Sequence, residues 1–409
     1  MTPPADRPAV RTRLALAAML LACTAAARAD DLTARLEPLV GRTLDLVELV
    51  SGRRLVRPVL EGIARRDDRA TTLRLRPEGE TRTISVPVAG VARIVAGRET
   101  VHEADGGTAA RNRRVRALHE REEAAARERM QARGVEPWPP LSAEEHATQV
   151  TELEGFVAEV QELFPALAIS RTHEFLVASD IPPAQLAPFT ARLDAMHDFL
   201  CDLYGIPRGE PVWKGKCLVV AFVREDDFVA FETRFMKVAT GGAHGLCHQR
   251  SDGRVLMACH RGDDPSAFAH MLVHETSHGF NHRWMSPQPL PNWLNEGIAE
   301  WVGTQVVPHC RQVPMKEARA AAFMKTGGSV GADFFSTDPD HHIDALQYGI
   351  ASGLVKFLVA RDRRKFAAFV RGIKEGMTAA DSLRASFDAT QEELVRSYGR
   401  AVGVPGLRE

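Results

Sequence analysis

Residues 265–284 have the sequence PSAFAHMLVHETSHGFNHRW, and a helix is expected over their whole length. His274 and His278 lie four residues apart, so on a helix both imidazoles project from one face and can bind one metal ion. Glu275 is one step round the helix, beside the position that such ligands leave open. A carboxylate placed there can take a proton from water as a general base.

A two-histidine motif needs a third ligand, and the segment 293–300 (WLNEGIAE) supplies one. Glu296 follows His278 after 17 residues, enough to leave the first helix, cross a proline-containing loop and begin a second helix. His274, His278 and Glu296 then form a three-ligand site with an open fourth position, which is typical of catalytic zinc. Glu300 lies one turn beyond Glu296 and can accept the second N–H of a ligating histidine.

These motifs resemble those of the gluzincins, the zinc peptidases related to thermolysin and aminopeptidase N. HETSH at 274–278 is followed by WLNEGIAEW at 293–301, and an aminopeptidase N-type motif W-L-N-E-G-F-A supplies that family's ligand glutamate. An overall likeness to bacterial peptidase-MA-like proteins of unknown function covers about residues 170–400. The resemblance implies an α+β, gluzincin-like metallopeptidase domain with Zn²⁺ as its cofactor and Glu296 as a ligand.

The same resemblance gives a role to Tyr348. The family carries a tyrosine before a hydrophobic helix, where the hydroxyl stabilises the tetrahedral oxyanion, and Tyr348 matches this but lacks the K-G of the family's Y-x-K-G. A tyrosine that packs on an amphipathic helix is the alternative. The spacing from His278 to Glu296 is one residue shorter than in aminopeptidase N, and the G-x-M-E-N motif that holds a free amino terminus is absent. Aminopeptidase specificity is therefore not implied.

Four other histidines lie near these motifs. His270 and His282 are on the same i+4 ridge as the ligands, and we expect them to pack or hydrogen-bond near the site rather than bind metal. His341 and His342 are rivals of Tyr348 as oxyanion stabilisers. Adjacent histidines in a loop are more often exposed to solvent, and we expect that of this pair.

The chain divides into four predicted segments. Residues 1–29 are predicted to be a signal peptide and 30–108 a small β-rich module that resembles SH3 or Sm barrels. Residues 109–142 are predicted to be a charged, solvated helix and a linker, and 143–409 the gluzincin-like zinc peptidase domain.

The coarse pattern of the last segment is α+β. We expect helices at 145–163 and 183–204, strands at 170–178 and 216–223, a hairpin at 245–260, and further helices from Leu294 to the end.

The N-terminus has the order of a secretory signal: a basic segment, the short apolar run LALAAMLLA at 14–22, and an A-x-A cleavage site at 27–29. The mature protein is therefore expected to be exported, and periplasmic or secreted. The alternative is a lipoprotein, because LLAC at 20–23 resembles a lipobox and would place a lipid anchor on Cys23.

Composition excludes some classes of partner. The 409 residues carry 52 Lys and Arg against 53 Asp and Glu, so the net charge of -1 predicts no nucleic-acid binding. No uncharged apolar run of 18 residues follows the first 30 residues, so no transmembrane span is expected.

Five cysteines follow the signal, an odd number. Cys247 and Cys259 flank a plausible turn at 251–254 and could face each other across two strands. Buried free thiols are the alternative.

The sequence thus predicts an exported zinc metallopeptidase that hydrolyses peptide bonds of a peptide or protein substrate. The strand near Arg254–Cys259 is expected to pair with an extended substrate. The alternative from another class is a non-catalytic, zinc-containing binding or scaffold protein of the cell envelope. Loss of Glu275 would favour that alternative, and Glu275 is present.

Overall fold

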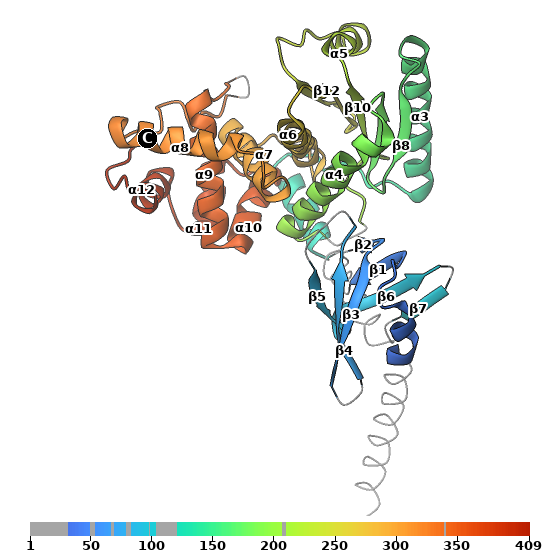
Figure 1. Ribbon diagram of the computed structural model, residues 1–409. Coiled ribbons are helices and arrows are strands. Elements are labelled where there is room, and N and C mark those ends of the chain that lie inside the picture. The colour runs from blue at the N-terminus through green and yellow to red at the C-terminus, as the bar shows by residue number, and fades with distance from the viewer. Residues whose placement is uncertain are drawn as a thin grey trace, which may run out of the picture. The chain divides into compact units, whose positions relative to one another are not determined.

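A computed structural model describes residues 32–49, 54–66, 69–78, 83–97, 99–103, 121–206, 210–338 and 341–409. The chain forms two compact units, Met1–Leu118 and His119–Glu409 (Figure 1). Each unit has its own hydrophobic core.

The predicted signal at 1–29, with Cys23, lies outside the described residues, as does the basic cluster at 111–116. None of the helices in the described part of the chain combines the length and hydrophobicity needed to cross a lipid bilayer.

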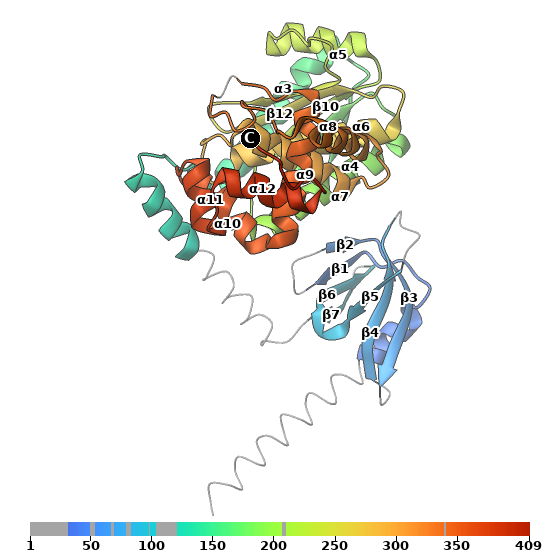
Figure 2. The ribbon, with the colours of Figure 1, turned by 90° about the vertical axis from the view of Figure 1, so that its left-hand side faces the viewer.

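The first unit is β-rich, as the sequence indicates. Its strands form two antiparallel sheets, with the orders β2-β1-β6-β7 and β3-β4-β5 (Figure 2). Leu73 and Leu75 alternate with more exposed residues, as expected for a strand that buries one face. The SH3- or Sm-like barrel stays a prediction. The elements are η1 (Glu37–Leu39), β1 (Leu46–Leu49), β2 (Arg54–Val56), β3 (Val59–Arg66), β4 (Arg69–Arg76), β5 (Ile84–Pro87), η2 (Val88–Gly90), β6 (Val91–Ala96) and β7 (Glu99–Glu103).

The second unit is built on a five-stranded sheet with the order β11-β12-β10-β9-β8. The three central strands are parallel, and both edge strands are antiparallel to their neighbours. Every residue of the central strands is buried, which explains their continuous apolar sequences. The strands are β8 (Ala168–Arg171), β9 (Phe175–Ser179), β10 (Cys217–Phe222), β11 (Gly245–Gln249) and β12 (Val255–His260).

The single strand predicted at 170–178 is wrong, because the structure has two strands there, β8 and β9. A tight turn separates them, in which the Thr172 hydroxyl accepts hydrogen bonds from the backbone N–H groups of Glu174 and Phe175. The pattern of apolar residues does not reveal this break, because the break depends on hydrogen bonds between the Thr172 side chain and the backbone.

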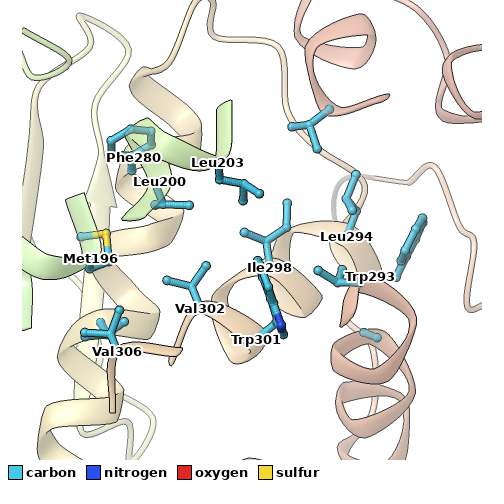
Figure 3. Packing of buried hydrophobic residues seen from close by; sticks show 14 of the residues in the cluster. Met196, Leu200, Leu203, Phe280, Trp293, Leu294, Ile298, Trp301, Val302 and Val306 are labelled. Atoms are coloured by element: carbon cyan, nitrogen blue, oxygen red, sulfur yellow. The ribbon is translucent and has the colours of Figure 1, made fainter. Parts of the chain in front are cut away.

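Helices cover both faces of this sheet. On one face lie α3 (Ala143–Leu163), α5 (Glu225–Phe231) and the π-helical turn η3 (Glu232–Met236). On the other face lie α4 (Pro183–Tyr204) and α6 (Pro265–Arg283), and α7 (Asn292–Val306) packs against both (Figure 3). The remaining helices continue this core on the side away from the sheet (Figure 1): α8 (Gln312–Gly327), α9 (Ala345–Arg361), α10 (Arg363–Lys374), α11 (Ala379–Phe387) and α12 (Gln391–Ala401).

Residues 121–142 belong to the second unit rather than to a free connection. Residues 121–132 are helical, and Met130 is buried. Arg129 forms a bidentate ion pair with Glu375 at 2.6 and 2.7 Å, and the Trp138 indole N–H donates to the His282 carbonyl at 3.0 Å. The segment expected to be a solvated helix therefore anchors the chain to this unit.

Cys217, Cys247, Cys259 and Cys310 are free thiols, and Cys201 Sγ lies 3.8 Å from His197 Nδ1. In the antiparallel pair of β11 and β12, Cys247 lies opposite Met257 and Cys259 lies opposite Gly245. The two cysteines that flank the turn therefore occupy a diagonal position instead of facing each other.

A buried lysine holds the loop between α6 and α7. Lys374 ends α10 with 1% of its surface exposed, and its ammonium donates to the Gln288 carbonyl at 2.8 Å. The Ser286 hydroxyl donates to the Lys374 carbonyl at 2.6 Å. Burial, and then the charge of Arg283, lowers the pKa of Lys374 from 10.5 to about 7.

This shift predicts a pH-dependent stability. Between pH 7 and 10.5 the unfolded chain binds the Lys374 proton more tightly than the folded chain does, so the free energy of unfolding rises with pH. Relative to Lys374→Met, which does not titrate, the wild type should therefore gain stability between pH 7 and 9.5. Denaturant unfolding of both proteins at the two pH values measures this, and a constant or falling difference would contradict it.

Candidate metal centre

Helix α6 is fixed at its start by its own sequence. The Asp264 carboxylate accepts hydrogen bonds from the backbone N–H groups of Ser266 and Ala267, and Pro265 occupies the first turn, where no donor is required. Further along, Gly279 lets the helix lie directly on Val255 and Cys247, because a Cβ there would overlap Val255. The HETSH segment is therefore held firmly against the sheet.

Three side chains converge between α6 and α7. His274 Nε2 and His278 Nε2 lie 3.1 Å apart, and they are 3.2 and 3.4 Å from Glu296 Oε2. Glu296 Oε2 is buried and has no hydrogen bond of acceptable geometry, although two ring nitrogens are so close. The three ligand atoms lie within 4.8 Å of one another, close enough to hold one metal ion. Among the described residues, this is the one group of three or more ligand-type side chains so arranged.

The charges within this group reinforce one another. Burial alone would lower the pKa of His278, but the Glu296 carboxylate outweighs burial and raises that pKa to about 9. Burial opposes ionisation of Glu296, yet His278 and His274 hold the pKa of Glu296 well below its usual value. The carboxylate thus requires a cation beside it. A metal ion would take the place of the histidine proton.

A second buried carboxylate, that of Glu300, lies one helical turn after Glu296 on α7. Glu300 has 1% of its surface exposed, and its Oε1 lies 3.8 Å from His274 Nδ1. It also forms an ion pair with Lys316 and lies 3.8 Å from His270 Nε2. Burial lowers the pKa of His270 to about 4, so this imidazole is neutral and packs against Gly303. At 3.8 Å the predicted hydrogen bond from a ligating histidine to Glu300 is not formed, although the carboxylate lies beside His274.

Glu275 has the surroundings expected of a general base. It is half-buried, and no hydrogen bond or ion pair to it occurs within the described residues. Its charge adds to burial in raising the pKa values of the thiols of Cys247 on β11 and Cys259 on β12. Its carboxylate therefore remains available beside β11 and the metal ligands.

Tyr348 is brought to the same place by α9. Asp344 and Gln347 form a capping box at the start of this helix, which puts Tyr348 in its first turn. Burial, followed by the neighbouring carboxylates with Glu296 first, raises the pKa of the Tyr348 hydroxyl. The hydroxyl therefore keeps its proton and can donate it in a hydrogen bond.

The remaining histidines have other contacts. His282 Nε2 lies 3.3 Å from the Arg250 carbonyl, and its ring packs edge-on against Trp138. His342 is exposed as expected, but His341 is half-buried, and its Nε2 lies 3.5 Å from the Asp333 carboxylate.

Two groups of residues near the ligands were not anticipated. The Tyr204 hydroxyl donates to Asn281 at 2.9 Å, and the Asn281 amide donates to Asn295 at 3.3 Å. Asn295 precedes Glu296, so its position on α7 was a usable signal. The second unanticipated residue is Lys316. No sequence signal points to it, because it lies on a separate helix, α8.

No protein-family model and no curated protein matches this sequence. The assignment of the site therefore depends on the arrangement of its side chains. That arrangement brings together all six residues predicted from the sequence: His274, Glu275, His278, Glu296, Glu300 and Tyr348.

The contact between α7 and α9 gives a prediction. A Cβ on Gly297 would lie 2.6 Å from the Ala351 carbonyl oxygen, so Gly297→Ala must push the two helices apart. We expect it to lower the free energy of unfolding by about 1–3 kcal/mol. Gly155 is an exposed glycine of α3 with open space around it, and Gly155→Ala should raise stability by about 0.5–1 kcal/mol. Equal effects in denaturant unfolding would contradict the close contact.

Proposed function

We propose that the protein is a zinc-dependent hydrolase of peptide bonds. The convergence of two imidazole nitrogens and one carboxylate oxygen, with the free carboxylate of Glu275 beside them, carries this proposal. Two nitrogens and one oxygen are a usual donor set for catalytic zinc, which keeps one position open for substrate or water. His274, His278 and Glu296 would hold the ion.

The other side chains then take distinct roles. Bound Zn²⁺ supplies Lewis acidity that polarises a peptide carbonyl and eases deprotonation of water. Glu275 accepts a proton from the attacking water and delivers it to the leaving nitrogen. The Tyr348 hydroxyl donates a hydrogen bond to the oxyanion that develops on the carbonyl oxygen. The placement of Glu275 and Tyr348 favours this reaction over a scaffold that only binds zinc.

The edge of the sheet offers a place for the substrate, but not on the strand that the sequence indicated. β12 lies between β10 and β11, so the prediction that residues 254–259 pair with substrate is wrong. The sheet has two edge strands, β8 and β11, and β11 is the neighbour of β12. The His244 carbonyl accepts from His260, and Arg250 donates to the Arg254 carbonyl.

Alternation along this ladder leaves the backbone groups of Gly245, Cys247 and Gln249 directed outward. An extended peptide paired with them would run beside Glu275, whose charge acts on the Cys247 thiol.

We also propose that the protein is exported, on the basis of the signal-like residues 1–29. This is compatible with a peptidase that acts on proteins of the cell envelope or the surroundings.

Replacing Glu275 tests the reaction. Glu275→Gln should keep one zinc per chain, because the residue is not a ligand, while kcat for cleavage of an unstructured protein falls by about 10²–10⁴-fold. Metal analysis and product formation by mass spectrometry measure the two effects. Glu162→Gln changes an exposed carboxylate of α3 and should alter neither. Zinc-free wild type, or undiminished cleavage by Glu275→Gln, would refute the proposal.

The edge strand gives a second test. Gln249→Pro removes one outward N–H, so it should raise KM for a peptide about 3- to 10-fold with kcat little changed. Gln249→Ala removes the same side chain but keeps the N–H and should behave like wild type. Identical KM values for both variants would exclude pairing at this residue.

A further inference from the structure

We infer that Lys316 is a positioning residue that links the two halves of this site, the metal-binding half and the oxyanion half. The inference rests on the proposed function and concerns a residue that contacts neither the ligand atoms nor the reacting atoms. Lys316 lies on α8, near its start, and 37% of its side chain is exposed.

On the metal-binding side, Lys316 neutralises a buried charge. Its ammonium forms an ion pair with Glu300 Oε1, and it is the one lysine or arginine paired with Glu300 within the described residues. A carboxylate so deeply buried is costly unless a cation accompanies it. The same Oε1 lies 3.8 Å from His274 Nδ1, so the ion pair fixes the oxygen that faces the ligand histidine.

On the oxyanion side, Lys316 holds an aromatic ring. Its ammonium lies 5.1 Å from the centroid of the Tyr348 ring, within the range of a cation–π interaction. This contact restrains the ring through its face and leaves the hydroxyl free for Glu296 or an oxyanion.

The backbone keeps Lys316 in reach of both partners. Gly349, the residue after Tyr348, packs directly on the Lys316 carbonyl, and a Cβ at that position would overlap the carbonyl oxygen and also crowd Ala320. The helices α8 and α9 are therefore in backbone contact at this point. The base of the lysine side chain cannot move away from Tyr348 without separating the helices.

Lys316→Met should therefore affect two properties. Without the cation, the Glu300 carboxylate is free to turn from His274, and zinc affinity should fall by about 10-fold. Without the ring contact, kcat at saturating zinc should fall by about 3- to 5-fold with KM little changed. Lys316→Arg keeps the charge and the stacking and should restore most of both.

A matched control exists on the same helix pair. Lys356 on α9 forms an ion pair with Glu317 on α8 at 3.3 Å, but it is exposed. Lys356→Met should leave zinc affinity and kcat unchanged. Competition with a chromophoric chelator measures zinc affinity, and thermal unfolding of the zinc-free proteins shows whether each variant folds.

Double-mutant cycles separate the two effects. In a Glu300→Gln background, Lys316→Met should no longer change zinc affinity, because the charge that it neutralises is gone. In a Tyr348→Phe background it should still lower zinc affinity but should have a smaller effect on kcat. Additive effects in both backgrounds would overturn the inference, since they would mean that Lys316 acts through other contacts.

Two further outcomes distinguish this inference from the proposed function. If wild type cleaves peptides and Lys316→Met equals wild type in zinc affinity and kcat, the inference fails and the hydrolase stands. If wild type binds zinc but cleaves nothing, the proposed function fails. A fall in zinc affinity that Lys316→Arg restores would then still support the positioning role.

Discussion

The arrangement of side chains around the site depends on two carboxylates that are buried one turn apart on α7. Glu296 and Glu300 are almost inaccessible, and a pair of buried negative charges is tolerated only when cations and donors surround it. The structure supplies Lys316 to the second carboxylate and two histidines of α6 to the first. A divalent cation between the histidines and Glu296 would neutralise the remaining buried negative charge. The same buried carboxylates would therefore contribute both to metal binding and to the stability of the folded unit.

Three glycines let the helices around these carboxylates pack closely against their neighbours. Gly297 lies against the Ala351 carbonyl, Gly303 lies against His270, and Gly349 lies against the Lys316 carbonyl. Gly297 directly follows Glu296, and Gly349 directly follows Tyr348. The contacts of Gly297 and Gly349 therefore hold α7, α8 and α9 close together beside the ligands and Tyr348.

Much of the site could be predicted from the sequence because its spacing is local. His274 and His278 are one helical turn apart, as are Glu296 and Glu300, and helical periodicity alone places each pair on one face. Interactions between elements that are far apart in the chain could not be predicted from local spacing. The ion pair of Lys316 has no spacing rule, because it depends on how α8 packs beside α7 and α9.

The fold shows the same division. Long apolar helices and buried strands were recognised from their periodicity, whereas the break at Thr172 depends on a side-chain hydrogen bond. The order of strands depends on tertiary pairing, so the sequence could not show that β12 is interior and that β11 is an edge strand.

X-ray diffraction at the zinc absorption edge, from crystals grown with the metal the protein carries when purified, tests the central claim most directly. The account predicts one anomalous peak about 2 Å from the Nε2 atoms of His274 and His278 and from a carboxylate oxygen of Glu296. A zinc peak bound by other residues, or no peak among these three when zinc is in excess, would contradict it.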